Sequence, residues 1–278
     1  MKCVELKNGI KVDGVSDLDL AQTLDCGQSF RWVQQDDGSF SGIACGKSVK
    51  VNLEGDTLYI ENATKEDFDK IWYNYFDLSL DYGKIRAEIA KIHPILNEAA
   101  KYAPGIRILR QEPYEALCTF IISQNNNIKR IKGIVERLCE CFGEKINGGY
   151  AFPTPDQMAS LTPDDLAPLR AGFRNRYLID AAQKVNSGEV CLDKCKSCDY
   201  EEARAELMKI KGVGVKVADC TLLFGFHRVE AFPIDVWMKR AMEKLFISMS
   251  AEDFGEYAGI AQQYIFHYSR MHPELFND

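Results

Sequence analysis

The sequence contains no run of about 18 apolar residues, the length that a membrane-spanning helix requires. Its first residues, MKCVELK, also lack the apolar core of a secretory signal peptide. These two absences lead us to expect an intracellular protein with no membrane partner.

The chain also lacks an excess of positive charge, since the formal net charge is -7 at pH 7. Nonspecific affinity for nucleic acid comes mainly from cations that neutralise phosphates, so this charge argues against a protein that coats nucleic acid indiscriminately. It does not exclude a local basic surface, because lysine and arginine cluster within residues 129–132, 170–176, 209–216 and 239–240.

Signs of a disulfide framework are missing too. In an intracellular chain the ten cysteines are expected to be reduced thiols. Cys191, Cys195 and Cys198 form the closest group, with a spacing that a metal could use, but no fourth ligand is evident nearby and the segment reads as a polar connector. We expect no metal site, with a metal at these three cysteines as the alternative.

The composition that is present, 46% hydrophobic and 27% charged over 278 residues, is that of a globular protein of one or two domains. Residues 1–104 contain short stretches of alternating polar and apolar residues, such as 48–53, separated by Asp-Asp-Gly and Glu-Gly-Asp turns. This pattern predicts antiparallel strands and hairpins. Helices are expected at 65–75 and 82–100, and the Tyr-Ala-Pro-Gly segment at 102–105 predicts a boundary.

The rest of the chain, residues 105–278, carries apolar residues at spacings of three and four, which predicts helices. The expected helices cover residues 114–123, 128–142, 155–161, 175–187, 200–210, 215–225, 236–245 and 255–270. The sequence therefore predicts an α+β fold in which an antiparallel sheet is followed by a mainly helical region.

Gly212 and Gly214 come between two of these helices, where residues without a Cβ reach positive φ at little cost and let the chain turn tightly. The amides and the dipole at the start of the second helix suit a phosphate. Lys216 and Cys220 lie four apart and share one face of that helix. Taken singly these features are ordinary, because a lysine in a first helical turn is usually solvated and Asp235 could simply cap the next helix.

The order and spacing of the same features are more specific. The glycine hairpin followed by Lys216, Cys220, Pro233 and Asp235 closely resembles the helix-hairpin-helix DNA glycosylases. Within that superfamily, the run GVGVKVADC at 212–220 looks like the 8-oxoguanine DNA glycosylases. Three further runs resemble the same family in the same order: CGQSFRW at 26–32, SQNNNIKR at 123–130 and YAGIAQ at 257–262.

The resemblance implies an N-terminal α+β domain with an antiparallel sheet at residues 1–104, followed at 105–278 by a mainly α-helical, two-lobed helix-hairpin-helix glycosylase domain. The helix-hairpin-helix would occupy 201–225 and the loop with the catalytic aspartate 226–236, with DNA bound across the cleft between the lobes. It also implies a monomer whose partner is double-stranded DNA containing oxidised guanine. Such a protein would be cytoplasmic and nucleoid-associated in a prokaryote, and nuclear in a eukaryote.

The implied activity is that of a bifunctional DNA glycosylase and AP lyase, which excises 8-oxoguanine opposite cytosine in base excision repair. Lys216 is the expected nucleophile: its neutral amine would attack C1′ of the deoxyribose, form an imine and permit β-elimination. The positive end of a helix dipole favours a neutral amine. Asp235 would stabilise positive charge on the sugar, and Pro233 would orient the chain before it. Relatives that only remove the base keep such an aspartate but lack the lysine.

For the flipped base, the resemblance implies a pocket formed by Gly27, Cys220, Gln262 and Phe266. Cys220 and Phe266 would sandwich the base, and stacking on an aromatic ring contributes about 1–3 kcal/mol. Gln262 would hydrogen-bond the Watson–Crick edge, and the Gly27 carbonyl would accept the N7–H that 8-oxoguanine has and guanine lacks. The plainer alternative makes Phe266 a core aromatic, Gln262 a surface amide and Gly27 a turn.

The remaining predicted contacts with DNA and with the base opposite the lesion are Asn125, Asn126, Arg130, Phe173, Arg174, Gly212, Gly214 and Trp237. Asn125, Arg130 and Arg174 match family positions that contact the cytosine. Phe173 stands where these enzymes often have a tyrosine wedge, which keeps an aromatic ring there. Trp237 stands where the best-known eukaryotic members have histidine, which puts one phosphate or pocket contact in doubt because indole carries no charge.

No redox cofactor is expected. The resemblance implies a monovalent cation at the hairpin carbonyls near 210–215, and the lack of cysteine after Cys220 argues against the iron–sulfur cluster of endonuclease III relatives. Two alternatives remain open: a glycosylase for another damaged or alkylated base, and a non-catalytic helix-hairpin-helix module that only binds DNA.

Overall fold

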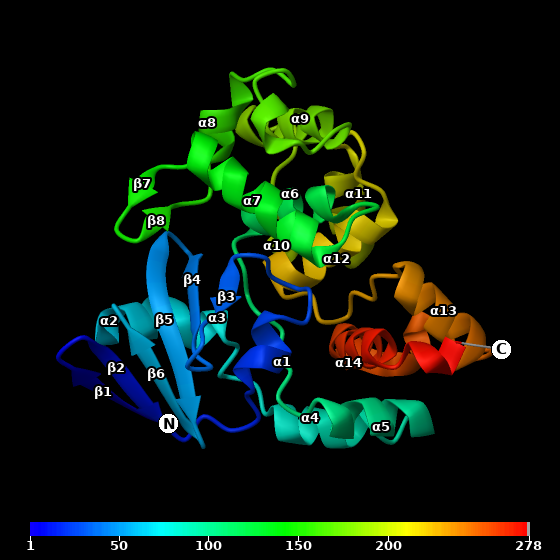
Figure 1. Cartoon of the computed structure of the whole chain (residues 1–278). Coiled ribbons are helices and arrows are strands. Elements are labelled where there is room, and N and C mark those ends of the chain that lie inside the picture. Colours follow the sequence, from blue (N-terminus) through cyan, green and yellow to red (C-terminus); the bar gives the residue numbers. More distant parts are fainter. Residues whose placement is uncertain (277–278) are drawn as a thin grey trace.

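Six antiparallel strands form one sheet in the computed structural model of the chain, which describes residues 1–276 (Figure 1). Their order across the sheet is β1-β2-β6-β5-β4-β3. The strands are β1 (Lys2–Leu6), β2 (Gly9–Asp13), β3 (Trp32–Gln34), β4 (Phe40–Ala44), β5 (Lys47–Glu54) and β6 (Thr57–Glu61), and helix α1 (Leu20–Leu24) lies between β2 and β3 in the chain. The predicted antiparallel sheet is confirmed.

One face of the sheet is buried in the protein core. Paired residues of neighbouring strands point to the same side of the sheet, so they are buried together. Ile60 pairs with Ile10 on one side and with Val51 on the other, and all three are buried. The predicted helix at 65–75 is present as α2 (Lys65–Asp67), a π-helical turn η1 (Phe68–Trp72) and α3 (Tyr73–Tyr75). Trp72 of this helix belongs to the same core as the three strand residues.

The prediction of one helix over 82–100 is wrong, because the chain forms α4 (Tyr82–Ile89) and α5 (Pro94–Tyr102) there. Pro94 occupies the first turn of α5 and His93 is its N-cap. A proline has no N–H to continue a preceding helix, and its ring pushes the residue before it into an extended conformation. His93 is extended accordingly, with φ -154° and ψ 144°.

Helices make up most of the chain after residue 112. They are α6 (Pro113–Ser123), α7 (Ile128–Phe142), α8 (Pro155–Ala159), α9 (Arg174–Asn186), α10 (Lys194–Ser197), α11 (Tyr200–Met208), α12 (Val215–Phe226), α13 (Val236–Lys244) and α14 (Ala258–Met271), with the small hairpin β7 (Lys145–Ile146) and β8 (Gly149–Tyr150) and the short 3-10 helices η2 (Ala167–Leu169), η3 (Ala251–Tyr257) and η4 (Pro273–Phe276). The predicted helix 255–270 starts later, as α14, because Gly255 has φ 71° and ψ -156°. Within residues 1–276 no helix is long and apolar enough to cross a membrane.

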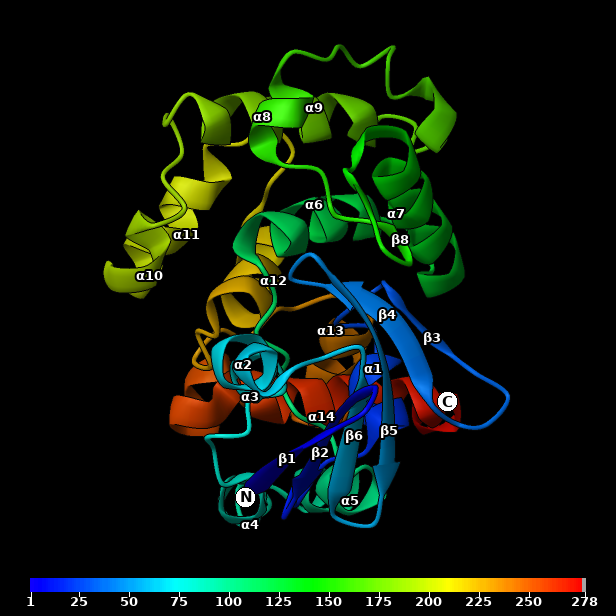
Figure 2. The same cartoon turned by 90° about the vertical axis from the view of Figure 1, so that its left-hand side faces the viewer.

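Two groups of helices lie on either side of α6 and α12, which pack against each other (Figures 1 and 2). In both views α8 and α9 lie at the top, whereas α4, α5 and α14 lie at the bottom. This arrangement confirms the predicted sheet followed by a largely helical body. The predicted boundary between residues 104 and 105 stays a prediction, because α5 packs on α14 and so joins the chain before the boundary to the helical body.

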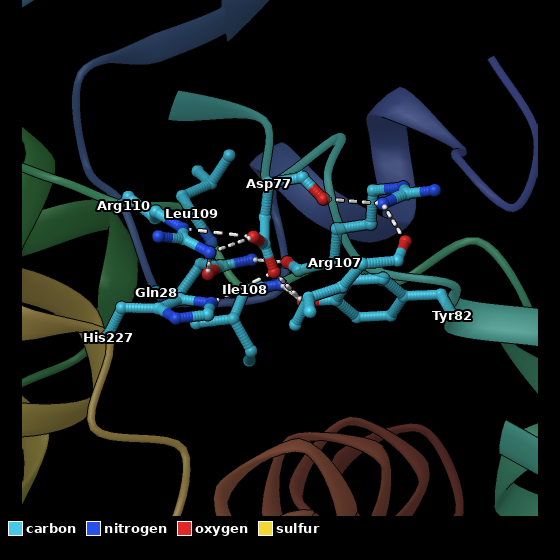
Figure 3. A network of polar contacts seen from close by, with 9 residues as sticks. Gln28, Asp77, Tyr82, Arg107, Ile108, Leu109, Arg110 and His227 are labelled. Atoms are coloured by element: carbon cyan, nitrogen blue, oxygen red, sulfur yellow. Dashed lines mark hydrogen bonds and ion pairs between the residues drawn. The ribbon is translucent and has the colours of Figure 1, made fainter. Parts of the chain in front are cut away.

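A buried carboxylate ties α12 to the segments that precede the helical body (Figure 3). Asp77, which is 0% exposed, accepts hydrogen bonds from Tyr82 Oη at 2.8 Å and from Arg110 Nη2 at 2.6 Å. Nε2 of His227, the residue that ends α12, lies 2.9 Å from Asp77 Oδ2. The guanidinium of Arg107 donates to the Asp77 carbonyl at 2.7 Å. The C-terminal end of α12 is therefore fixed to the segment around Asp77 through the side chain of His227.

Asp77→Asn is expected to lower the free energy of unfolding at pH 7 by about 2–3 kcal/mol, because Arg110 and His227 lose a charged acceptor. Burial raises the pKa of the Asp77 carboxyl, but the contact with His227 and the charge of Arg110 outweigh burial and lower it below 3.8. Stability from a lowered pKa is present above the unfolded value and is lost as the pH falls through the folded value. Urea unfolding should therefore show the deficit of the variant at pH 7 and a smaller deficit at pH 3.

Asp69→Asn is the matched control, since Asp69 pairs with Lys65 in an exposed i,i+4 ion pair. We expect little change in unfolding for this variant at either pH. Equal stability of wild type and Asp77→Asn at pH 7 would contradict a stabilising role for the buried carboxylate.

Candidate active site

The glycine hairpin joins α11 to α12, and its two glycines differ. Gly212 has φ +81°, and a Cβ there would lie 2.3 Å from the Tyr177 ring, so both its conformation and its surroundings require glycine. Gly214 has φ -99° and ψ -177° and is the N-cap of α12. The expectation that both glycines reach positive φ is therefore right for Gly212 and wrong for Gly214. One left-handed residue is enough to reverse the chain here, and the second glycine serves as a cap with no side chain.

Lys216 lies in the first turn of α12, half-buried against α6. Its Nζ donates to the hydroxyl of Ser123 at 3.1 Å and lies 5.4 Å from the centroid of the Phe120 ring. Within residues 1–276 no carboxylate forms an ion pair with Lys216. The amine is thus held by a neutral partner and does not have the surroundings of a solvated surface lysine.

Asp235 is both a helix cap and a residue of the cavity that Lys216 lines. Its Oδ1 accepts the Met238 N–H at 2.8 Å, which caps α13. Among residues 1–276, its Oδ2 has no hydrogen-bond donor. The capping interpretation is therefore correct but incomplete, because one carboxylate oxygen remains available to a molecule in the cavity.

The cavity has a volume of about 290 Å³ and is formed by segments far apart in the sequence. Eight of the predicted site residues line it: Gly27, Asn126, Lys216, Cys220, Asp235, Trp237, Gln262 and Phe266. Six others, Asn125, Arg130, Phe173, Arg174, Gly212 and Gly214, do not line it. The structure thus brings both predicted catalytic residues and all four predicted base-binding residues into one site.

Gln262 and Phe266 lie one turn apart on α14 and both border the cavity. Gln262 is 4% exposed, and its Oε1 is a buried oxygen that has no hydrogen-bond partner among residues 1–276. A buried polar atom without a partner is costly, so this acceptor fits a donor that arrives with a ligand. Phe266 is half-buried and its ring borders the cavity. Gln262 is therefore not a surface amide, whereas Phe266 packs against the hydrophobic core and also borders the cavity.

The position of Gly27 also requires a residue without a side chain. It has φ +93°, and a Cβ would lie 3.2 Å from Ile128 Cδ1 and 3.4 Å from Phe266 Cε1. Such a Cβ would project towards the ring on which a base could stack. Gly27 is therefore more than a turn, because its lack of a side chain keeps this part of the cavity open.

Cys220 faces the cavity as a neutral thiol. Burial raises the pKa of this thiol to about 11, although the charge of neighbouring Lys216 acts in the opposite direction. A thiol with this pKa is protonated at neutral pH and is a poor nucleophile. It can supply a packing surface for a base, and the role of Lys216 as the nucleophile of the site stays a prediction.

Apart from the two hairpin glycines, the predicted contacts outside the cavity fall into two groups. Asn125, Arg130 and Phe173 are exposed, with Phe173 45% exposed, so they are accessible to DNA. Arg174 is 3% exposed, and its guanidinium donates to the carbonyls of Gln124, Asn125 and Ala171. Arg174 therefore shapes the loop that carries Asn125, and a direct contact with the opposite base stays a prediction.

Several residues of the site were not predicted from the sequence. Ser123 and Phe120 contact Lys216 only because α6 packs on α12, and no local sequence pattern predicts that these two helices pack together. Gln263 and Arg270 also line the cavity. Arg270 follows Phe266 by four residues on the same helix, so its helical spacing could have identified it.

The cysteine group at 191–198 is not arranged around a common point. In the described part of the chain, residues 1–276, no three His, Cys, Asp or Glu side chains are grouped so that they could hold a metal. Cys195 is buried, and its thiol donates to the carbonyls of Cys191 at 3.7 Å and Ala203 at 3.8 Å. These are the contacts of a thiol packed inside a protein.

Two models of known protein families match consecutive parts of the chain. The family model of the N-terminal domain of 8-oxoguanine DNA glycosylase matches residues 12–117, and that of the HhH-GPD superfamily of base excision DNA repair proteins matches residues 118–257. The N-glycosylase/DNA lyase of Saccharomyces cerevisiae is 34% identical over 263 residues, which cover 82% of this chain and 68% of that protein.

Two solved structures resemble the whole chain. MBOgg1 in complex with a low-affinity DNA ligand has a TM-score of 0.94 and 43% identity, covering 98% of this chain and 99% of its own. The 8-oxoguanine glycosylase/lyase of Clostridium acetobutylicum, in complex with double-stranded DNA containing cytosine opposite 8-oxoguanine, has a TM-score of 0.93 and 39% identity, with the same coverage of 98% and 99%. Together with the cavity that Lys216 and Asp235 share, these matches show that the chain belongs to the 8-oxoguanine DNA glycosylases of the helix-hairpin-helix superfamily of base excision repair proteins.

Proposed function

We propose that this protein excises 8-oxoguanine from duplex DNA opposite cytosine and then cleaves the strand by β-elimination. The observation that carries the proposal is one cavity lined by both predicted catalytic residues, Lys216 and Asp235. Gly27, Gln262 and Phe266 line the same cavity. The names of the relatives, which include glycosylase and lyase activities and a complex with a lesion opposite cytosine, support the same reaction.

The chemistry follows from an amine and a carboxylate beside one sugar. The neutral amine of Lys216 attacks C1′, the base leaves with the electrons of the glycosidic bond, and ring opening gives an imine between Lys216 and the sugar. Loss of a proton from C2′ then expels the 3′ phosphate. Asp235 stabilises the positive charge that develops on the sugar, through the carboxylate oxygen that does not cap α13.

Recognition of the lesion rests on hydrogen bonding as well as on stacking. The base leaves the helix stack at a cost of a few kcal/mol, and Phe266 and Cys220 return part of it by packing on its two faces. The Gly27 carbonyl accepts N7–H of 8-oxoguanine, where normal guanine has a lone pair. The unpartnered oxygen of Gln262 accepts from the Watson–Crick edge, which in a guanine derivative carries N–H donors.

We expect wild type to excise 8-oxoguanine fastest opposite cytosine. Arginine has only donors, and an unpaired cytosine offers the acceptors N3 and O2, whereas adenine presents its N6 amino group. A good bidentate contact gives about 1–3 kcal/mol of discrimination. Arg130→Ala should therefore flatten the preference more than it lowers the rate on the best pair. Arg174→Ala should also flatten the preference, because it loosens the loop at Asn125 that the Arg174 guanidinium holds.

Single-turnover excision opposite each of the four bases measures this preference. Equal rates in wild type would mean that Arg130 does not read the opposite base and that Arg174 only supports the loop at Asn125. Faster removal of an alkylated purine than of 8-oxoguanine would favour the alternative of a glycosylase for alkylated bases, which needs no acceptor for an N7–H.

A monovalent cation at the hairpin remains part of the proposal. Backbone carbonyls are suitable ligands, and within residues 1–276 the carbonyls of Lys211 and Val213 accept no backbone or side-chain hydrogen bond, which fits a cation there. Such a cation would help the hairpin to bind a DNA phosphate. Function as a monomer, and a location in the cytoplasm near the nucleoid or in the nucleus, are likewise proposed.

A further inference from the structure

The carbonyl before Gly27 is held by the helix that carries the base-binding residues. The Cys26 carbonyl accepts hydrogen bonds from Gln263 Nε2 and from Arg270 Nη1, each at 3.4 Å. Gln263 is 2% exposed, and both donors belong to α14. By contrast, no donor among residues 1–276 bonds to the carbonyl of Gly27 itself. The Gly27 carbonyl, which is proposed to accept N7–H, is therefore available to a ligand, whereas the Cys26 carbonyl before it is already hydrogen-bonded.

The carbonyl after Gly27 is fixed by a different part of the molecule. Gln28 is fully buried, and its Nε2 donates to the carbonyls of Thr23 at 2.8 Å and Arg107 at 2.7 Å. Its Oε1 accepts the Leu109 N–H at 2.9 Å, and its carbonyl accepts from Gln111 Nε2 at 2.7 Å. This side of Gly27 is held without any contribution from α14.

The conformation of Gly27 alone does not fix the direction in which its carbonyl points. A glycine populates a wide range of φ and ψ, and here φ is +93°, a conformation with no side chain to hold it. The direction of the carbonyl therefore depends on the peptides on either side. The Gln28 side is strongly bonded, whereas the Cys26 side depends on two long hydrogen bonds from Gln263 and Arg270. These two bonds are the part of the arrangement that can be removed without disturbing the buried side chain of Gln28.

We propose that Gln263 and Arg270 are positioning residues that aim the Gly27 carbonyl at N7–H of the flipped 8-oxoguanine, and so set the selectivity for oxidised over normal guanine. This inference rests on the proposed function. Arg270 also connects the acceptor to the stacking surface, because its guanidinium lies 5.4 Å from the centroid of the Phe266 ring. One helix thus fixes both the ring and the distance between the ring and the carbonyl.

The size of the effect follows from the geometry of hydrogen bonds. A hydrogen bond weakens steeply as it departs from alignment, and a neutral hydrogen bond contributes about 1 kcal/mol net. Loss of one positioning contact is therefore expected to slow excision of 8-oxoguanine by about five- to tenfold. Cleavage at a preformed abasic site should not depend on the contact, because no base is present for Gly27 to read.

The test uses Gln263→Met, which removes the donor with little change of shape, Arg270→Met, which removes the guanidinium, and Arg270→Lys, which keeps a charged donor. For each, single-turnover excision from an 8-oxoguanine–cytosine duplex is compared with β-elimination on a duplex that carries a preformed abasic site. We expect the ratio of the excision rate to the rate of abasic-site cleavage to fall about five- to tenfold in the two methionine variants. Arg270→Lys should recover most of the excision rate.

Two outcomes overturn the inference. A parallel loss of both activities would assign the two residues to DNA binding or to stability, and unchanged excision in both methionine variants would show that the Cys26 contacts do not aim the carbonyl. Failure of the proposed function is a separate result, since it would leave wild type itself unable to excise 8-oxoguanine.

Discussion

Lys216→Gln is expected to fold and to bind lesion DNA, yet to lose both base release and covalent trapping by borohydride. Glutamine can keep a hydrogen bond to the Ser123 hydroxyl, which Lys216 Nζ now makes at 3.1 Å, so the local structure should survive. An amide cannot form an imine, so the step that links protein to sugar is lost. Removal of one member of a catalytic unit can cost on the order of 10⁴-fold or more in rate, and we expect a loss of that size.

The measurement combines single-turnover base release with borohydride reduction on a duplex that contains 8-oxoguanine. Lys211→Gln is the matched control, because Lys211 lies in the same hairpin, is exposed and is outside the cavity. It should trap like wild type and bind DNA somewhat more weakly through the loss of one cation. Persistent crosslinking in Lys216→Gln would contradict the assignment and would point to Lys209, Lys211 or the N-terminal amine.

The sequence predicts the elements of this fold well where local chemistry decides them. The helix predicted at 128–142 has these bounds in the structure, because Asn127 caps its start and an apolar stripe runs along it. The failures occur where one residue interrupts a pattern that otherwise continues. Pro94 divides a predicted helix, and Gly255 delays the start of α14. In both cases the apolar spacing passes through the break, so periodicity alone does not reveal it.

The sequence predicts those residues of the candidate site that belong to recognisable motifs. Lys216, Asp235 and the four base-binding residues come from runs that resemble a family, and the structure gathers them in one cavity. The surroundings that tune them were not predictable. The hydroxyl of Ser123 reaches Lys216 across 93 positions, and Arg270 reaches the Cys26 carbonyl across 244. Such contacts depend on helix packing, which a single sequence does not encode in any local pattern.

Arg174 shows a second limit of inference from motifs. Its position resembles that of residues that contact the opposite cytosine, but here its donors are engaged by backbone carbonyls at 124, 125 and 171. A motif specifies the residue type and its order in the chain. It does not specify whether the side chain contacts the substrate or supports the loop that does, and only the geometry separates these two roles.

Asp235→Asn separates the charge of this residue from its role as a helix cap. Asparagine is as good an N-cap as aspartate, so the hydrogen bond from Met238 N–H at 2.8 Å should be retained. The free energy of unfolding should then change by well under about 1 kcal/mol. The second carboxylate oxygen becomes an amide nitrogen, which carries no negative charge to stabilise the sugar. We therefore expect single-turnover excision to fall on the order of a hundredfold or more, about 2.7 kcal/mol or more in activation free energy.

The matched control is Asp81→Asn, because Asp81 caps α4 in the same way, accepting the Lys84 N–H at 2.9 Å, and lies outside the cavity. Both variants should unfold like wild type, and only Asp235→Asn should lose excision. If excision is unchanged in Asp235→Asn, the carboxylate is a cap and the positive charge of the sugar must be stabilised elsewhere. If both variants lose stability, the cap contributes more than expected, and the rates must be compared at equal folded fraction. A loss of rate without a loss of stability assigns the negative charge of Asp235 to catalysis, because charge is the one property that asparagine removes while its capping oxygen stays in place.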